Sequence, residues 1–469
     1  MELLNNLILG VVDFLYQPWC VPLILLAGGI ILTVRSKFIQ ARLFKESFKV
    51  IMEKPATENG ISSFGALMVS TASRVGTGNI IGVATAICAG GAGAVFWMWV
   101  TAIIGGASAF VESTLAQIYK KKNPDGTSYG GPAFYMRDAL GQRWLGVIFS
   151  VLIIATYAVG YNMLAAYNLQ DTFSAFDFYS RTTAVVIGVI LAVLFGIIVI
   201  GGAKRMVKVT EVMVPVMGVL YVLVAILVLI LNAKQIPAMF GMIFESAFDF
   251  KAIFGGFAGS CIMNGIKRGL YSNEAGMGSA PNAAATADVS HPAKQGLVQM
   301  LSVFIDTLLI CTATAFMCLS SGVEFNADMG GASYVQSAMQ ANLGGFGPIF
   351  LCVAMSLFAF TTLIGNYSYC EGCLRFIMNR EVSKTGLLAF RIIATALVFV
   401  GAIASAGTVW NLADMTQGLM VVVNVPVILI LMKPAMKCLD DYCKQKKEGK
   451  NPVFVAKEAG IDAELDFWK

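Results

Sequence analysis

Residues 72–82 of the chain read ASRVGTGNIIG, and they decide the fold because they place an arginine and three glycines inside a long apolar segment. A glycine destabilises a helix by about 1 kcal/mol relative to alanine, so Gly76 and Gly78 favour an unwound turn between two helical halves. Unwound backbone is tolerated at membrane depth only where protein covers it or where it lines a cavity. A nucleotide-binding loop is disfavoured, because the spacing departs from G-x-G-x-x-G and no strand precedes it.

The composition around this stretch is that of a protein embedded in lipid. Of 469 residues, 57% are hydrophobic and 13% are charged, whereas about a quarter of the residues of a soluble domain are charged. Segments long enough to cross about 30 Å of hydrocarbon recur along the chain. The sequence predicts eleven of them, at residues 17–35, 62–89, 94–119, 144–169, 182–200, 209–232, 252–278, 295–320, 346–370, 386–407 and 411–432.

The net charge of +5 indicates topology and does not predict nucleic-acid binding. Most Lys and Arg residues fall in alternate connecting segments, at 35–54, 120–143, 204–208, 375–384 and in the tail from residue 433. The positive-inside rule then places the N-terminus outside and the C-terminus in the cytoplasm. We expect a multi-pass protein of a bacterial or archaeal plasma membrane, with a transmembrane domain over 1–433, a peripheral cytoplasmic tail over 434–469, and lipid as its surroundings.

The interrupted segment has a counterpart later in the chain. After one leading span, ten spans divide into two sets of five, spans 2–6 and spans 7–11, and each set begins with a glycine-rich polar interruption: RVGTGN in the first, and MNGIKRGLYSNEAGMG in the second. Because five is odd, the two sets must have opposite orientations in the membrane. Matched interruptions in inverted repeats are typical of transporters whose binding site lies between the repeats.

Charged residues at membrane depth need partners or water. Nine lie within or at the edges of the predicted spans: Arg74, Glu112, Lys267, Arg268, Glu274, Asp288, Asp306, Glu371 and Asp414. The sequence predicts that three of them form a network that gates the cytoplasmic side: Arg74, Arg268 and Glu274. The alternative is that they form permanent structural ion pairs. His291 is the only histidine and lies in a polar segment, where a solvated residue is expected rather than a proton carrier.

The ends of broken helices predict the kind of ligand. The amino end of a half-helix favours a carboxylate, and the carbonyls at the end of the other half favour a cation, so an amino acid together with Na⁺ fits the arrangement. The adjacent hydroxyls of Thr361 and Thr362 suit a sodium site, although they could equally bond to carbonyls of their own helix.

Several long segments resemble one known family, the alanine or glycine:cation symporters, and the similarity runs from about residue 20 to the C-terminus. The segments are SRVGTGNIIGVATAI (73–87), GAVFWMWVTAIIGG (93–106), YGGPAFYM (129–136), RGLYSNEAGMGSAPNAAATADVSHPAKQGLVQ (268–299), FIDTLLICTAT (304–314) and WNLADMTQGLM (410–420). The resemblance implies an all-helical protein of eleven spans, in which spans 2–11 form the five-plus-five inverted repeat of the leucine-transporter fold. It also implies co-transport of a small neutral amino acid with Na⁺.

The resemblance also assigns residues to the site. The amino acid would contact Gly76, Thr77, Gly78 and Asn79, opposite Met263, Asn264 and Gly265 of span 7. The sodium ion would lie between the carbonyls of Ala72 and Val75 and the hydroxyls of Thr361 and Thr362.

Two departures from the family pattern bear on the substrate. Ala165 stands where a glutamine is expected, and Asn366 stands where an aromatic residue is usual. A larger and more polar pocket would favour glutamine over alanine, because a buried amide left unpaired costs about 1–3 kcal/mol. If neighbouring side chains refill the space, the site is an alanine or glycine site.

The sequence therefore predicts a sodium-coupled amino-acid symporter without an organic cofactor, nucleic-acid partner or obligate protein partner. Proton coupling is an alternative to sodium coupling, and a cation channel is the alternative from another class of protein. An intramembrane enzyme is disfavoured, since no nucleophile and base form a convincing set.

Overall fold

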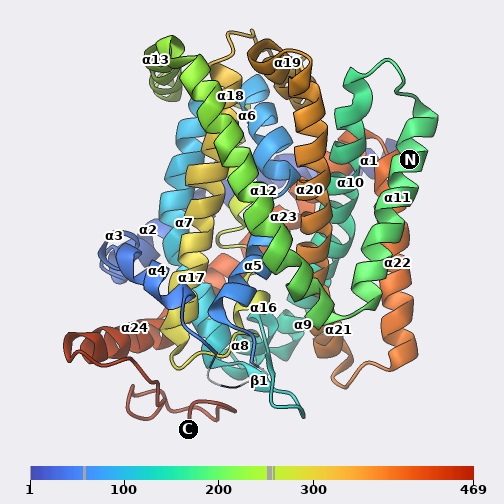
Figure 1. The fold of residues 1–469 in the computed structure, drawn as a ribbon. Coiled ribbons are helices and arrows are strands. Elements are labelled where there is room, and N and C mark those ends of the chain that lie inside the picture. The colour runs from blue at the N-terminus through green and yellow to red at the C-terminus, as the bar shows by residue number, and fades with distance from the viewer. Residues whose placement is uncertain (1, 56, 58–59, 251–255, 257–258) are drawn as a thin grey trace.

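The computed structural model describes all residues except 1, 56, 58–59, 251–255 and 257–258. The described part is a bundle of long helices with one short antiparallel hairpin, in which β1 (Lys121–Lys122) pairs with β2 (Ser128–Tyr129). Figure 1 shows α13 and α19 at one end of the bundle and α24 with the C-terminus at the other. We name these the α19 end and the α24 end of the bundle.

The helices before residue 250 are α1 (Glu2–Leu15), α2 (Val21–Arg35), α3 (Ile39–Arg42), α4 (Phe44–Ile51), α5 (Ser63–Arg74), η1 (Gly78–Gly82), α6 (Val83–Gly90), α7 (Gly93–Ile118), α8 (Pro132–Asp138), α9 (Arg143–Ile153), η2 (Ile154–Tyr161), α10 (Asn162–Thr172), η3 (Phe173–Ala175), α11 (Arg181–Ile200), α12 (Ala203–Leu231), η4 (Ala233–Gln235) and α13 (Ile236–Ala247). Those after it are α15 (Cys261–Asn273), α16 (Pro281–Ala284), α17 (Pro292–Phe304), η6 (Ile305–Cys311), α18 (Thr312–Leu319), α19 (Gly331–Leu343), α20 (Phe346–Ser368), α21 (Cys370–Met378), α22 (Lys384–Ile403), α23 (Ala406–Ile430) and α24 (Met432–Lys447).

Eight helical segments within the described residues are long and apolar enough to cross a membrane. They are Gly93–Ile118, Arg143–Ala175, Arg181–Ile200, Ala203–Leu231, Pro292–Leu319, Phe346–Met378, Lys384–Ile403 and Ala406–Ile430. They correspond to eight of the eleven predicted spans. The other three are shorter as helices: α2 has 15 residues, the second predicted span is divided between α5 and the segment formed by η1 and α6, and the described helix of the seventh is α15, which ends at Asn273.

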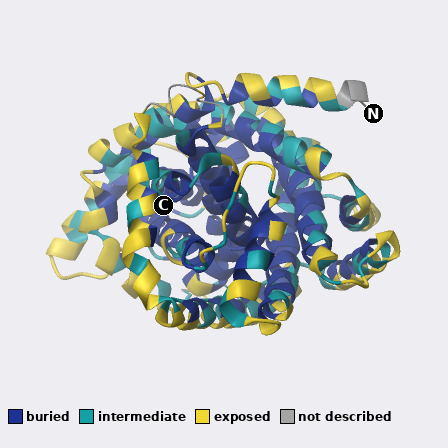
Figure 2. Cartoon of the chain, turned by 90° about the horizontal axis from the view of Figure 1, so that it is seen from above, coloured by how far each residue is buried: buried dark blue, intermediate teal, exposed yellow. Residues whose placement is uncertain are grey.

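The outer surface of the bundle is apolar where it would meet lipid. Helix α11 leaves Ile190, Val193 and Ile197 more than half exposed, and α12 does the same with Val212 and Val219. Viewed along the bundle axis, buried residues fill the centre and exposed residues form the rim (Figure 2). Exposed apolar side chains over whole helices indicate a membrane-facing surface, so the chain is a multi-pass membrane protein.

The second predicted span is broken at Val75–Thr77, as the sequence predicts. Helix α5 begins where the Ser62 side chain accepts a hydrogen bond from the amide of Gly65, and it ends at Arg74. The two glycines of this segment also allow other helices to pack closely against the break. A Cβ on Gly76 would overlap Thr362 Oγ1, and one on Gly78 would lie 2.8 Å from the ring of Tyr271.

The seventh predicted span is also broken, at its end nearer the α24 side. Helix α15 is continuous through Cys261–Asn273, and Glu274 ends it in the left-handed region with φ of 55°. Gly276 and Gly278 follow with φ of 86° and 78°, values that glycine adopts without strain. The interruption is therefore in the SNEAGMG part of the motif. The predicted beginning of this span, at residues 252–258, lies mostly outside the described residues.

Three spans contain a π-helical stretch in the middle of the membrane segment: η1, η2 and η6. A π-helix is rare, and within α-helices it occurs frequently at functional sites. Two of these stretches, η1 and η6, contact each other.

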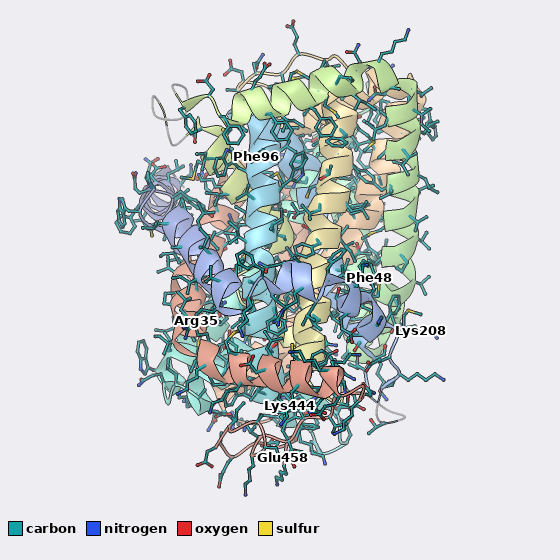
Figure 3. The ribbon with its side chains drawn as sticks, turned by 90° about the vertical axis from the view of Figure 1, so that its left-hand side faces the viewer. Arg35, Phe48, Phe96, Lys208, Lys444 and Glu458 are labelled. Carbon is teal, nitrogen blue, oxygen red and sulfur yellow. The ribbon has the colours of Figure 1, made fainter. Side chains whose placement is uncertain are left out.

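The tail is docked against the bundle rather than merely peripheral. Helix α24 lies across the α24 end, and the chain around Glu458 continues beneath it (Figure 3). The amide of Phe454 donates to the carbonyl of Ser290 at 2.9 Å, and Trp468 Nε1 donates to the carbonyl of Gln117 at 2.7 Å. The tail thus holds the ends of α7 and α17 together.

Candidate sodium and amino-acid site

The break after α5 leaves two carbonyls without their helical donors. In a continuous helix, the amides of Gly76 and Asn79 would bond to the carbonyls of Ala72 and Val75, four residues earlier. Here the amide of Gly76 donates to Asn79 Oδ1 at 2.7 Å, and the amide of Asn79 donates to the carbonyl of Gly76 at 3.1 Å. The carbonyls of Ala72 and Val75 are therefore available to a cation.

Thr362 of α20 brings a hydroxyl to the backbone of the break. Its Oγ1 is buried and has no hydrogen-bond partner in the described structure, and it lies against Gly76. Helix α20 approaches closely because Gly365 has no side chain: a Cβ there would overlap the amide nitrogen of Ser73. A buried hydroxyl without a partner is costly, and a bound cation would satisfy it.

Thr361 is differently engaged. Its Oγ1 lies 2.9 Å from the carbonyl of Leu357 and 3.1 Å from that of Phe358, and 3.3 Å from the sulfur of Met217. The hydroxyl hydrogen is thus used within its own helix, and only the oxygen lone pairs remain for a ligand. The two threonines that the sequence predicts as a pair differ in this respect.

The half-helix formed by η1 and α6 supplies donors to the same region through its amino end. The first amides of a helix lack intrahelical acceptors, and in the described structure those of Gly76 and Asn79 are satisfied locally. The amides of Thr77 and Gly78 remain as the donors that a helix amino end presents to an anion.

Thr77 connects three elements at this point. Its Oγ1 lies 3.1 Å from the hydroxyl of Tyr271 in α15 and accepts from Asn168 Nδ2 in α10 at 3.2 Å. The ring of Tyr271 faces Gly78 and packs edge-on against Tyr161 and Trp410, with ring centroids 4.8 and 5.5 Å apart. Asn168 and Tyr271 contact the break, and the sequence analysis did not select them, although Tyr271 stands in the RGLYSNEAG motif.

The structure does not place Met263, Asn264 and Gly265 opposite the break. All three lie near the beginning of α15, at the α19 end. A Cβ on Gly265 would lie 2.6 Å from the Cβ of Trp97, and Asn264 Nδ2 donates to the carbonyl of Ser260 at 3.2 Å. The residue that faces Gly78 is Tyr271, nearly two helical turns further along.

Asn366 is bonded to protein groups on both sides. Its Nδ2 donates to Asn162 Oδ1 at 2.9 Å, and its Oδ1 lies 2.6 Å from Ser73 Oγ. Ala165 is buried in α10 and lies between Asn162 and Asn168 on one helix face, by the three-residue spacing of that helix. Ala165 thus lies on the face of α10 whose two amides reach Thr77 and Asn366, and the amide of Asn366 braces α5 and α10 against α20.

Two charge pairs lie on opposite sides of the break. Toward the α24 end, Arg74 Nε is 4.0 Å from Glu274 Oε2, with both side chains fully buried, and Ser279 donates to the same carboxylate at 2.7 Å. Toward the α19 end, Arg268 binds Asp414 through two hydrogen bonds of 3.1 and 2.9 Å.

The predicted network of Arg74, Arg268 and Glu274 is therefore divided. Arg268 stacks on Trp410, with its guanidinium carbon 4.3 Å from the ring centroid, and it does not join the pair formed by Arg74 and Glu274. No local sequence signal identifies its partner, because Asp414 lies 146 residues away in the chain.

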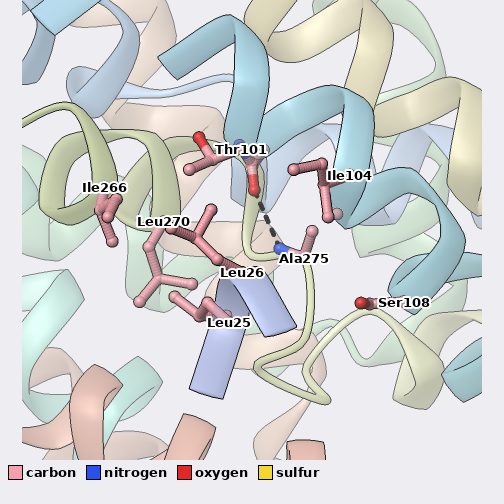
Figure 4. A pocket seen from close by; sticks show the side chains of 10 residues that line it. Leu25, Leu26, Thr101, Ile104, Ser108, Ile266, Leu270 and Ala275 are labelled. Atoms are coloured by element: carbon pink, nitrogen blue, oxygen red, sulfur yellow. Dashed lines mark hydrogen bonds between the residues drawn. The ribbon is translucent and has the colours of Figure 1, made fainter. Parts of the chain in front are cut away.

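One pocket lies beside the second break but has a different character. Leu25 and Leu26 of α2, Ile104 of α7 and Leu270 of α15 line it, with Ala275 at its edge (Figure 4). The lining is mostly apolar, with Thr101, Ser108 and Asn273 as its polar members, so it suits hydrocarbon better than a zwitterion. Tyr271, the residue of α15 that contacts the first break, lies on another face of that helix.

Interrupted helices that meet at membrane depth, with bare carbonyls and free amides, define a secondary transporter. The chain belongs to the sodium:alanine symporter family, whose model matches residues 1–456. It is a sodium-coupled transporter and not an enzyme.

The chain is similar to several curated proteins over nearly its full length. It is 46% identical to the amino-acid carrier protein AlsT of Bacillus subtilis, over 92% of this chain and 91% of that protein. It is 44% identical to the probable sodium/glutamine symporter GlnT of Bacillus subtilis, over 97% and 94%. It is 36% identical to the sodium/alanine symporter AgcS of Methanococcus maripaludis, over 91% and 94%.

The fold is similar to that of MhsT, a transporter of the leucine-transporter fold solved in complex with L-phenylalanine. The TM-score is 0.54 at 15% identity, over 82% of this chain and 90% of MhsT. At this identity the likeness concerns the fold alone.

Proposed function

We propose that the protein imports a small neutral amino acid with Na⁺ and that it accepts glutamine in preference to alanine. The observation that carries the proposal is that one unpartnered hydroxyl, Thr362 Oγ1, lies against Gly76, in the stretch where the carbonyls of Ala72 and Val75 lack their helical donors. Thr361 would complete the sodium site with a lone pair. Sodium is a hard cation, and these are neutral oxygen ligands.

The amino acid would bind next to the ion, at the start of the outer half-helix. Its carboxylate would accept from the amides of Thr77 and Gly78, where the positive end of the helix dipole also favours it. Asn79 would hold the backbone of the site in place, because it bonds to both the amide and the carbonyl of Gly76. We assign Met263, Asn264 and Gly265 to the outer approach to the site rather than to the site itself.

The preference for glutamine rests on the space at Ala165. A small residue on the face of α10 between Asn162 and Asn168 leaves room for a longer substrate side chain, and those two amides could pair with a substrate amide. Asn366 supports this less directly than the sequence suggests, because its own amide is bonded to Ser73 and Asn162. The relative named for glutamine is 44% identical to this chain, and the relative named for alanine is 36% identical.

Alternating access would use the two charge pairs as opposite gates. Arg268 with Asp414 would close the outer side, and Arg74 with Glu274 the cytoplasmic side. This assignment assumes eleven spans with spans 2–6 and 7–11 as inverted repeats, an external N-terminus and a cytoplasmic tail. Na⁺ binding would order the break and raise the affinity for the amino acid, and by linkage the amino acid would raise the affinity for Na⁺ equally.

The test is uptake of labelled glutamine and alanine into proteoliposomes, with and without an inward Na⁺ gradient. We expect Na⁺-driven glutamine uptake that excess alanine inhibits weakly. Alanine uptake that is indifferent to glutamine would contradict the substrate preference and leave the symporter intact. Uptake driven by a proton gradient without Na⁺ would contradict the sodium site, and absence of counterflow would favour a channel.

A further inference from the structure

We propose that Asp306, in the π-helical stretch η6, sets the geometry of the sodium site by acting through Asn79. Asp306 is fully buried and belongs neither to the proposed sodium ligands nor to the proposed substrate contacts. It is a positioning residue supplied by a third span. This inference rests on the sodium site of the proposed function.

A short relay of hydrogen bonds connects Asp306 to the break. Asn79 Nδ2 donates to Asp306 Oδ1 at 2.7 Å, and Asn79 Oδ1 accepts from the amide of Gly76, also at 2.7 Å. The carbonyl of Asn79 accepts in turn from Thr314 Oγ1 at 2.6 Å. Both ends of the Asn79 side chain and its main chain are therefore held.

The relay fixes which way the Asn79 amide points. A main-chain amide can only donate a hydrogen bond, and a carboxylate oxygen can only accept one. If the Asn79 side-chain amide were turned over, its NH₂ group would face the amide of Gly76 and its oxygen would face the carboxylate of Asp306. With Oδ1 directed at Gly76, the amide of Gly76 cannot bond to the carbonyl of Ala72. Asp306 thereby keeps a proposed sodium ligand free.

Asp306 also links the second broken span to the first. Its Oδ2 accepts from Ser272 Oγ of α15 at 2.7 Å and from Thr307 Oγ1 at 2.9 Å. All of these donors are neutral, and among the described residues Asp306 forms no ion pair. Hydrogen bonds to an ionised acceptor are about twice as strong as neutral ones, so one carboxylate can hold both spans.

The experiment measures Na⁺ binding to the purified full-length protein without amino acid, and Na⁺-dependent uptake in proteoliposomes. Asp306→Ala removes the acceptor, and we expect the Na⁺ concentration for half-saturation to rise about tenfold or more. Asn79→Asp sets two carboxylates against each other and should weaken Na⁺ binding at least as much. Asp306→Asn keeps an acceptor but loses the charge, so its effect should be smaller.

The exchanged pair, Asn79→Asp with Asp306→Asn, gives the decisive comparison. In this double variant the carboxylate introduced at position 79 can still accept from Gly76, while the amide introduced at position 306 donates to it. We therefore expect half-saturation to return to within about threefold of the unmodified protein. Ser272→Ala is the matched control: it removes one donor to Asp306 without touching the relay, and we expect a change below about threefold.

Three results would overturn the proposal. They are an unchanged Na⁺ affinity in Asp306→Ala, an exchanged pair no better than Asn79→Asp, and a Ser272→Ala variant as weak as Asp306→Ala. Thermal unfolding identifies any variant that misfolds. If Asp306→Ala is one of these, the Na⁺ affinities of Asn79→Asp and of the exchanged pair are compared instead, and they decide whether the relay sets the sodium site. Failure of the unmodified protein to bind Na⁺ would instead contradict the proposed function.

Discussion

Gly76 has no room for a side chain, because the hydroxyl of Thr362 occupies the place of its Cβ. We expect Gly76→Ala to push α5 and α20 apart at the cost of about 1–3 kcal/mol, and to lower Na⁺ affinity together with thermal stability. Gly218→Ala in α12 is the control, since a Cβ there meets nothing within 4 Å. Equal loss of Na⁺ binding in both variants would contradict the close approach at Gly76.

The two neighbouring threonines should respond differently to substitution. Thr362→Ala removes the unpartnered hydroxyl, and losing a charged contact worth about 1.5–3 kcal/mol raises the Na⁺ concentration for half-maximal uptake roughly 10- to 100-fold. Thr361→Ala should have a smaller effect, because that hydroxyl bonds to its own helix. Titration of uptake against external Na⁺ measures both, and a larger effect at Thr361 would contradict the division.

At the level of single residues, the sequence predicted types of residue well and partners poorly. The glycines at 76 and 78 and the threonines at 361 and 362 could be selected because few residue types form a break or a neutral oxygen site. The different engagement of the two threonines depends on which face α20 turns toward α5. The partners of Asn366 and Arg268 come from segments more than 100 residues away, and nothing local in the sequence specifies them.

Among the helices, α15 and α23 are joined by the two hydrogen bonds between Arg268 and Asp414. Removing one member of a buried ion pair leaves the other charge unpaired, so we expect Arg268→Ala to destabilise the protein by about 3–5 kcal/mol. The double variant Arg268→Ala with Asp414→Ala should be less destabilised than Arg268→Ala alone. Thermal unfolding of the three proteins in detergent checks this, and purely additive losses would argue against the pairing.

The spans were predicted from length and apolar composition, and eight of the eleven are long apolar helices in the described structure. The breaks are harder to place, because a glycine marks where a helix can end without requiring that it does. Gly265 and Gly269 sit inside α15 to allow contact with α7, whereas Gly276 and Gly278 have positive φ. Helix α15 therefore continues through Gly265 and is interrupted only after Asn273. For this reason residues 263–265 do not lie opposite the first break, where the sequence predicted them.

Across the whole molecule, the tail and the bundle meet around His291. The ring lies between Tyr442 and Phe454, with centroids 5.1 and 5.0 Å away, and Nε2 is 3.2 Å from Asp441. Burial lowers the pKa of His291 from 6.5 to about 4, and Lys294 acts in the same direction, against the neighbouring Asp441. The histidine that the sequence predicts as solvated is thus buried and neutral at physiological pH.

This histidine makes the docked tail sensitive to acid. Because its pKa is lower in the folded protein than in the unfolded chain, the stability it contributes is present above about pH 6.5 and is lost as the pH falls toward 4. We expect the unfolding temperature to drop between pH 7.5 and 5. His291→Asn keeps an acceptor for the amide that the ring now caps but does not titrate, so its drop should be smaller; an equal drop would place the sensitivity elsewhere.

The docking of the tail could not be predicted from composition. Its many charges indicate solvent, and its apolar residues occur in short groups, such as VFVA at 453–456 and FW at 467–468, without the length of a membrane span. The structure buries Phe454, Ile461, Leu465 and Trp468, because the extended chain beyond α24 turns these side chains toward the ends of α7 and α17. Only the folded arrangement of distant segments brings their partners into place.

The three π-helical stretches have a consequence for how this protein tolerates insertions and deletions. A π-turn contains one residue more than an α-turn, so deleting a single residue from η6 would convert it to an α-helix without breaking the span. The helix on either side of the deletion would keep its rotational phase, because the residue removed is the extra residue of the π-turn. The residues inside η6 would change the face they present, so Asp306 would lose its registration with Asn79 while the span itself remained.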